Sequence, residues 1–354
     1  MALSTNQITS ITSGPRQSNF ELLRIIAMAM VLGLHFNFKY SGIPSIQGVN
    51  GDLLVDAFRC LMECLCLPAV NVFILISGWF SIRATRSGLI AYLYQCFFFL
   101  ILTYLIYLWY TENSFSAGGI LSCFALTKYG WFIVSYLILY LLTPFVNSYI
   151  NSSSSHQIKL CLIALFSVSM LYGWIGGNSN YNNGYTAVSF IGLYILGRYL
   201  SIYCRLIPIN WVILFIVSTG LNFFLIFLDT TFFKCVGLSR LMSYVNPIII
   251  LQSASLLMIF SKISLNVNRT INFVAKSSFA VYLLHDCSKY EESLMVRAVN
   301  IISENFNDVA YFGVILACIV AIYFIAVSID QLRIFSWNKI KSSLSRVLDK
   351  DILY

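Results

Sequence analysis

Long apolar stretches recur along the whole chain and limit what it can fold into. A helix needs about 20 mostly apolar residues to cross a bilayer, and only helices and closed barrels satisfy their backbone polar groups inside lipid. We therefore expect an all-α, polytopic integral membrane helix bundle with about ten transmembrane helices. They should lie near residues 20–38, 65–82, 89–110, 130–150, 158–176, 186–203, 209–228, 243–261, 271–287 and 309–329.

The composition supports this class. Hydrophobic residues make up 59% of the chain, charged residues make up 10%, and the mean hydropathy is +0.80. A formal charge of +8 would suggest nucleic acid as the partner of a soluble protein. Basic cytoplasmic loops explain the charge better here, and no group of Lys and Arg lies among stacking aromatic residues. The expected partners therefore include a lipid bilayer and no nucleic acid.

The distribution of basic residues predicts the orientation. If the N-terminus is cytoplasmic, 15 of the 22 Lys and Arg residues fall on that side of the membrane and 7 fall on the other. Because cytoplasmic loops carry the excess of Lys and Arg, both termini should lie inside. We expect a disordered cytoplasmic tail at residues 1–18, a transmembrane domain at 19–335 and a basic cytoplasmic tail at 336–354.

The first apolar stretch carries three ionisable residues, Glu21, Arg24 and His35. Eleven residues of α-helix make about three turns, so His35 should lie on the same face as Arg24 and ~16 Å above it. Glu21 is one turn before Arg24, close enough for an ion pair. Such groups inside a bilayer usually face a bundle interior or a wet cavity, so this helix is predicted to form the wall of an active site. Alternatively, Arg24 anchors the helix at the headgroups, and His35 is a hydrogen-bonded interfacial histidine.

Other candidates have weaker signals. Arg83 and Arg86 follow the second span, where guanidinium groups could clamp phosphate, although the positive-inside rule also places such pairs. Trp131 begins the fourth span, where an interfacial aromatic belt is the ordinary explanation. His285 ends the ninth span and should reach the outer face. Asp330 and Arg333 end the tenth span as a structural cap, and Pro247 should interrupt the eighth.

The cysteines do not suggest a metal site. The chain has ten cysteines, mostly scattered inside apolar stretches, where they resemble small buried hydrophobic residues. Cys60, Cys64 and Cys66 are close in sequence but have no nearby histidine. We expect no metal there.

Four blocks in order carry a resemblance to a known family. They are FELLR with a histidine eleven residues after its arginine, FILISGWF followed by Arg-x-x-Arg, GWFIVSYLILYLLTP, and SSFAVYLLH. The chain resembles the acyltransferase 3 family of integral-membrane acyltransferases, and the resemblance covers nearly the whole chain. Many members carry an aspartate where this chain has Asn71, which leaves no acid role there. Some members carry a fused extracytoplasmic hydrolase-like domain. We expect that its contribution either comes from an extracytoplasmic partner protein here or is unnecessary.

The resemblance implies acetyl-CoA or a related acyl-CoA as a co-substrate, with no permanently bound cofactor. It implies a glycan or lipid-linked glycan as the acceptor, and the bacterial inner membrane as the location. Arg24, Arg83 and Arg86 would bind the donor, and Glu21 would hold Arg24. His35 would be the general base or would carry the acyl group, and Trp131 and His285 would contact the acceptor. A glycan transporter or exporter without acyl transfer is the alternative.

Overall fold

The computed structural model describes residues 16–44, 53–112, 114–124, 130–177, 179–203, 208–287, 289–306 and 308–343, and within these ranges it contains helices and no β-strand. The predicted disordered tail lies mostly outside the described residues, as does the end of the C-terminal tail.

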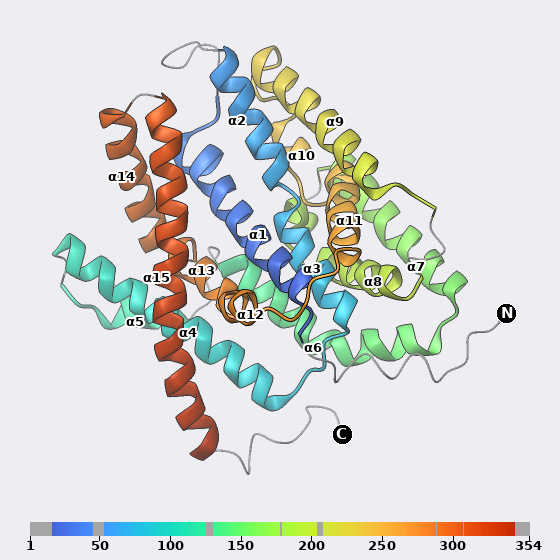
Figure 1. The fold of residues 1–354 in the computed structure, drawn as a ribbon, viewed down its shortest axis with the longest axis horizontal. Coiled ribbons are helices and arrows are strands. Elements are labelled where there is room, and N and C mark those ends of the chain that lie inside the picture. Colours follow the sequence, from blue (N-terminus) through green and yellow to red (C-terminus); the bar gives the residue numbers. More distant parts are fainter. Residues whose placement is uncertain are drawn as a thin grey trace.

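The helices pack around a blue N-terminal helix in the middle of the molecule (Figure 1). They are α1 (Ser18–Leu34), η2 (His35–Lys39), α2 (Leu53–Cys66), α3 (Ala69–Phe80), α4 (Arg86–Thr111), α5 (Ala117–Phe124), α6 (Trp131–Ser152), α7 (Ser155–Val168), η4 (Ser169–Ile175), η5 (Ser179–Gly184), α8 (Ala187–Tyr203), α9 (Trp211–Thr231), α10 (Leu238–Leu241), α11 (Pro247–Ser261), α12 (Arg269–Ala275), α13 (Ser278–His285), α14 (Lys289–Asn305) and α15 (Asp308–Ser343).

Seven helical segments in the described part of the chain are long and apolar enough to cross a membrane. Three other predicted spans are helical but shorter: α8 and α11 have 17 and 15 residues, and residues 271–287 form α12 and α13. The seven segments are Ser18–Lys39, Leu53–Phe80, Arg86–Thr111, Trp131–Ser152, Ser155–Ile175, Trp211–Thr231 and Ala310–Ser343.

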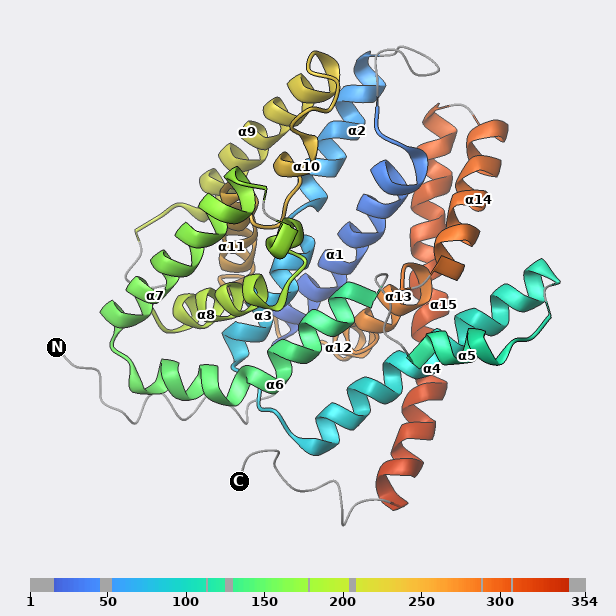
Figure 2. The same cartoon turned by 180° about the vertical axis from the view of Figure 1, so that it is seen from behind.

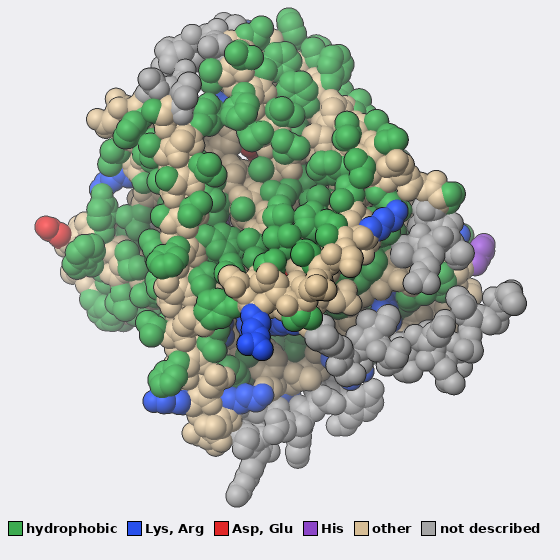
Figure 3. Space-filling view, in the orientation of Figure 1, with side chains coloured by type: hydrophobic (Ala, Val, Ile, Leu, Met, Phe, Trp, Pro, Cys, Tyr) green, Lys and Arg blue, Asp and Glu red, His purple; other side chains and the backbone are tan. Residues whose placement is uncertain are grey.

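The outer surface has the character of a membrane protein. Large apolar side chains on the outward faces of α9 and α15 are exposed, for example Ile216 and Phe324. Hydrophobic side chains cover most of the face in Figure 3, and most of its Lys and Arg side chains gather below them. Lipid contact explains an apolar exterior of this extent, because a soluble protein rarely exposes large apolar patches.

Close packing of α3 against α8 depends on two glycines. A Cβ atom on Gly78 would lie 2.0 Å from the Tyr194 carbonyl oxygen, and one on Gly197 would lie 2.2 Å from that of Leu75. Small residues let helix backbones approach each other in this way. Side chains of α3 form part of the wall of the cavity described below.

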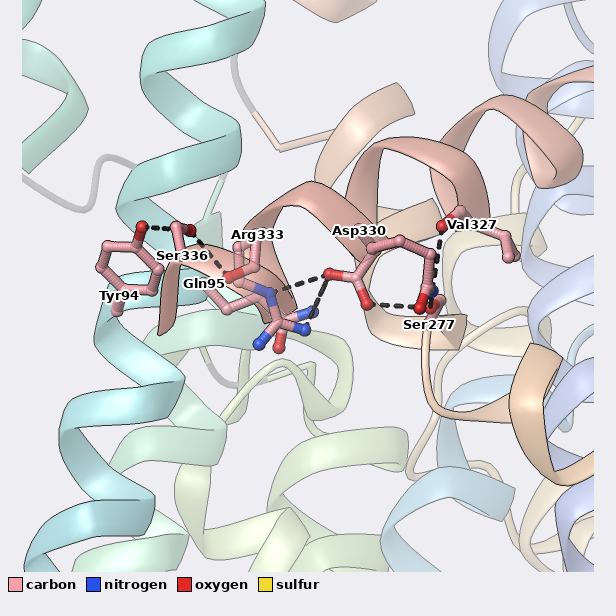
Figure 4. Close-up of polar contacts among 8 residues, drawn as sticks. Tyr94, Gln95, Ser277, Val327, Asp330, Arg333 and Ser336 are labelled. Atoms are coloured by element: carbon pink, nitrogen blue, oxygen red, sulfur yellow. Dashed lines mark hydrogen bonds and ion pairs between the residues drawn. The ribbon is translucent and has the colours of Figure 1, made fainter. Parts of the chain in front are cut away.

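Two local predictions were wrong. Pro247 is the first residue of α11, where its missing N–H breaks no hydrogen bond, so it does not interrupt the helix. Asp330 and Arg333 do not end a helix, because α15 continues to Ser343; they form a buried ion pair inside it (Figure 4).

Pro144 lies inside α6. Figure 2 shows α6 changing direction along its length. Proline removes one backbone hydrogen bond and crowds the preceding turn, which accounts for such a bend.

Candidate active site

A cavity of about 390 Å³ follows α1 through the interior of the bundle. Five of its lining residues are spaced by three or four positions, so they form a single stripe on this helix and its continuation η2. The stripe confirms that Arg24 and His35 share a face. Its members are Glu21, Arg24, Met28, Val31 and His35, and the other walls come mainly from α3, α6 and α13.

Charged groups line the cavity near the start of α1. Glu21 is buried and accepts from Arg24 in a short contact, as predicted, and from Arg16 Nη1 at 3.4 Å. The guanidinium carbon of Arg24 lies 5.9 Å from the ring centroid of Phe80, a favourable cation–π distance. The Arg24 side chain is 28% exposed, so part of it faces the cavity. This arrangement leaves cationic surface available to an anionic ligand.

The histidine near the end of α1 belongs to a buried network. His35 Nδ1 lies 3.0 Å from His285 Nε2, and His35 Nε2 lies 3.3 Å from Asp286 Oδ2. Asp286 also forms an ion pair with Lys39 and accepts from the Tyr40 hydroxyl at 2.9 Å. Lys39 and Tyr40 therefore hold the carboxylate beside the imidazole of His35.

Hydrogen bonding favours one tautomer of His35. The carbonyl of Val281 can only accept, so His285 Nδ1, which lies 2.6 Å from it, must donate. In a neutral His285, Nε2 is then an acceptor, and His35 Nδ1 donates to it. The lone pair of a neutral His35 is therefore on Nε2, next to Asp286. This nitrogen can take a proton, and the carboxylate would stabilise the imidazolium that forms.

The comparisons with known proteins identify a family for this chain. The model of the acyltransferase 3 family, described as an acyltransferase domain, matches residues 17–330. The chain belongs to the acyltransferase 3 family. The matched region contains α1, the cavity and the histidine network, so this is a multi-pass membrane protein with an acyltransferase domain. No curated protein and no solved structure matches the chain.

The third block begins α6 and contributes an aromatic wall to the cavity. Trp131 lines the cavity, and its ring centroid lies 4.3 Å from that of Tyr185 and 6.1 Å from that of Tyr244. Tyr244 lines the cavity as well. Burial raises the pKa of the Tyr185 hydroxyl, so it remains a hydrogen-bond donor at neutral pH. An aromatic surface of this kind can stack against a sugar ring or an acyl-thioester arm.

The arginines of the second block are placed differently. Arg83 is exposed on the turn between α3 and α4, and Arg86 is exposed as the first residue of α4. Neither lines the cavity, although their neighbour Ile82 does. Asn71, which replaces the family's aspartate, is buried and donates to the Tyr244 carbonyl at 3.0 Å. It thus holds the aromatic wall. Among the described residues, no group of His, Cys, Asp or Glu side chains is arranged to hold a metal ion.

Sequence reasoning missed several parts of the site. Asp286 directly follows His285, and this adjacency was the available signal. Lys39 lies four residues after His35 and meets the same carboxylate. The wider π-helical turn His35–Lys39 follows α1 and begins at the catalytic candidate. Such turns are common at functional sites. Nothing in the residue pattern predicts this one.

Proposed function

We propose that this protein is a membrane-bound O-acyltransferase that moves an acetyl or related acyl group from acyl-CoA to a hydroxyl of a cell-surface or exported glycan. One observation carries the proposal: the same cavity is lined by cationic side chains near the start of α1 and by His35 near its end. A cytoplasmic donor and an outer acceptor could meet in such a cavity. About ten spans, both termini inside and a bacterial inner membrane complete this proposal.

The donor would enter from the side of Arg24. Its phosphates would contact Arg24, with Arg83 and Arg86 on the nearby turn, because guanidinium groups bind phosphate oxygens in pairs. The pantetheine arm would then lie along the stripe past Met28 and Val31. The ~16 Å between Arg24 and His35, expected from helical rise, suits the length of this arm.

His35 would act in one of two ways. As a general base, Nε2 takes the proton of the acceptor hydroxyl while the oxygen attacks the thioester carbon; the carbon–sulfur bond breaks and His35 returns the proton to the CoA thiolate. As an acyl carrier, Nε2 attacks first and releases the thiolate. The hydroxyl then displaces the imidazole, and its proton goes to the thiolate.

The neighbours of His35 would support either route. Asp286 would stabilise the positively charged imidazole ring. His285 is fully buried and bonds to His35 Nδ1, which favours a positioning role over direct contact with the acceptor. Trp131 and Tyr244 would stack on the glycan or lipid-linked glycan. An extracytoplasmic partner protein would present this acceptor or accept the product.

The transporter alternative uses the same cavity as a pathway, without a donor. The acyl content of surface glycan should be measured by mass spectrometry in cells lacking the protein and in cells rescued with wild type, His35→Ala or His156→Ala. His156 is an exposed histidine on α7 outside the cavity, so it is the matched control. We expect wild type and His156→Ala to restore an acyl mass and His35→Ala to fail. Unchanged acylation with glycan missing from the surface would favour transport instead.

A further inference from the structure

The cavity has a third cationic residue beside Arg16 and Arg24, and neither the family's motifs nor the sequence pattern singled it out. Lys276 lies between α12 and α13, is exposed, and lines the cavity. Glu21 is the only carboxylate that lines the cavity near these three cations, and it is already paired with both arginines. Among the described residues, no carboxylate pairs with Lys276.

The segment that carries Lys276 is hydrogen-bonded to α1 on one side. Ser18 Oγ donates to Asn272 Oδ1 at 3.0 Å and accepts from the backbone N–H of Asn268 at 2.8 Å. These bonds join α12 to the first turn of α1, one turn before Arg24. They place Lys276 at the same end of the cavity as Arg24.

The other side of the segment is hydrogen-bonded to α15. Ser277 does not cap α13; its hydroxyl donates instead to Asp330 Oδ2 at 2.8 Å, a contact visible in Figure 4. The Ser278 hydroxyl lies 2.8 Å from the Tyr323 hydroxyl. Asp330 is itself held by Arg333, whose Nη2 lies 2.7 Å away. The backbone on both sides of Lys276 is thus fixed, and Lys276 itself lines the cavity.

We infer that Lys276 is a donor-binding residue that contacts the phosphate groups of acyl-CoA, and that Ser277 and Asp330 position it. The inference rests on the proposed function and adds a residue to its donor site. The phosphates of CoA carry several negative charges, more than Arg24 alone can balance while it is paired with Glu21. A lysine without a carboxylate partner supplies a further charge and up to three donors.

Equilibrium binding to the purified full-length protein in detergent tests this inference, because it requires no acceptor. CoA and pantetheine, which lacks every phosphate, should be titrated against wild type, Lys276→Gln, Lys276→Arg and Lys262→Gln. Lys262, at the C-terminal end of α11, is an exposed lysine that does not line the cavity. We expect Lys276→Gln to weaken CoA binding about tenfold, as loss of one charge-assisted contact does, and to leave pantetheine binding unchanged. Lys276→Arg and Lys262→Gln should bind CoA as wild type does.

The outcomes separate the two claims. Equal CoA affinity in Lys276→Gln and wild type would overturn the role of Lys276 and leave the acyl-CoA proposal intact. A loss of pantetheine binding equal to the loss of CoA binding would also overturn it, because a phosphate contact cannot act on a ligand without phosphate. If wild type binds no CoA, the proposed function itself fails.

Discussion

Two ion pairs with the same sequence spacing have different surroundings in this protein. Glu21 with Arg24 in α1, and Asp330 with Arg333 in α15, are each an acidic residue followed three positions later by arginine. The Arg24 side chain is 28% exposed and lines the cavity. The Arg333 side chain is 9% exposed, and its partner Asp330 is fully buried. Asp330 also accepts hydrogen bonds from Gln95 and Ser277.

The comparison teaches that spacing identifies an ion pair but not its role. In α1 the arginine lines a cavity, where a ligand could bind it while it is paired with Glu21. In α15 the aspartate takes hydrogen bonds from two other parts of the chain, so the pair joins helices far apart in sequence. The first pair should therefore matter mainly for activity and the second mainly for stability.

Breaking the α15 pair should give the largest loss of stability. Arg333→Gln leaves the Asp330 carboxylate buried without its counter-charge, which typically costs about 3–5 kcal/mol. Thermal unfolding in detergent should show this loss. Arg24→Gln should lose clearly less stability, because Arg24 is partly exposed and Arg16 still pairs with the buried Glu21 carboxylate. Equal destabilisation by both variants would contradict the distinction.

Breaking the α1 pair should give the largest loss of activity in a folded protein. Arg24→Gln removes the guanidinium from the cavity, and we expect acyl transfer to fall by about 100-fold, equivalent to ~2.7 kcal/mol. Arg24→Lys should recover only part of the rate, because an ammonium group cannot form paired hydrogen bonds with phosphate. Transfer of radiolabelled acetyl groups in membranes, normalised to folded protein, measures the change. Full activity of Arg24→Gln would remove Arg24 from the site.

Replacing each whole pair sharpens the contrast. Exchange of a buried ion pair for apolar residues is often neutral, so Asp330→Leu with Arg333→Met should recover most of the stability that Arg333→Gln loses. Glu21→Leu with Arg24→Met should fold and remain inactive. Chemical denaturation and the acetyl-transfer assay separate the two results. An active α1 double variant would show that both pairs serve stability alone.

The smallest effect should come from the contact between Ser277 and Asp330. Ser277→Ala removes one hydrogen bond and should cost about 1 kcal/mol of stability. Because Ser277 is adjacent to Lys276, CoA binding should weaken by a few-fold without any change in pantetheine binding. Titration of both ligands measures this, and Ser261→Ala, at the end of α11, is the control outside the cavity. If Ser277→Ala binds CoA with unchanged affinity, the ion pair in α15 does not position the donor site.

Features that depend on local periodicity were predictable from the sequence. The long apolar helices followed from stretch length, and the shared face of Arg24 and His35 followed from helical geometry. The contact between Glu21 and Arg24 followed from their spacing. In each case the interacting residues belong to one helix, so the sequence carries the necessary geometry.

Features that depend on packing between distant segments were not predictable. His285 meets His35 across 250 positions, and Asp286 joins them because α13 packs beside the end of α1. The same limit explains the wrong interpretation of Asp330 and Arg333. An ionic pair at the end of an apolar stretch resembles a boundary, but its partners on α4 and beside α13 allow the helix to continue with the pair buried.

Consumption of acetyl-CoA is the measurement that tests the central claim most directly. Membranes containing wild type, His35→Ala or His156→Ala would receive acetyl-CoA labelled in the acetyl group, and label transferred to glycan would be followed against release of CoA thiol. We predict that wild type and His156→Ala transfer label and release CoA together, and that His35→Ala does neither. Transfer by His35→Ala at the wild-type rate would contradict the account, because the cavity would then lack the group assigned to its chemistry.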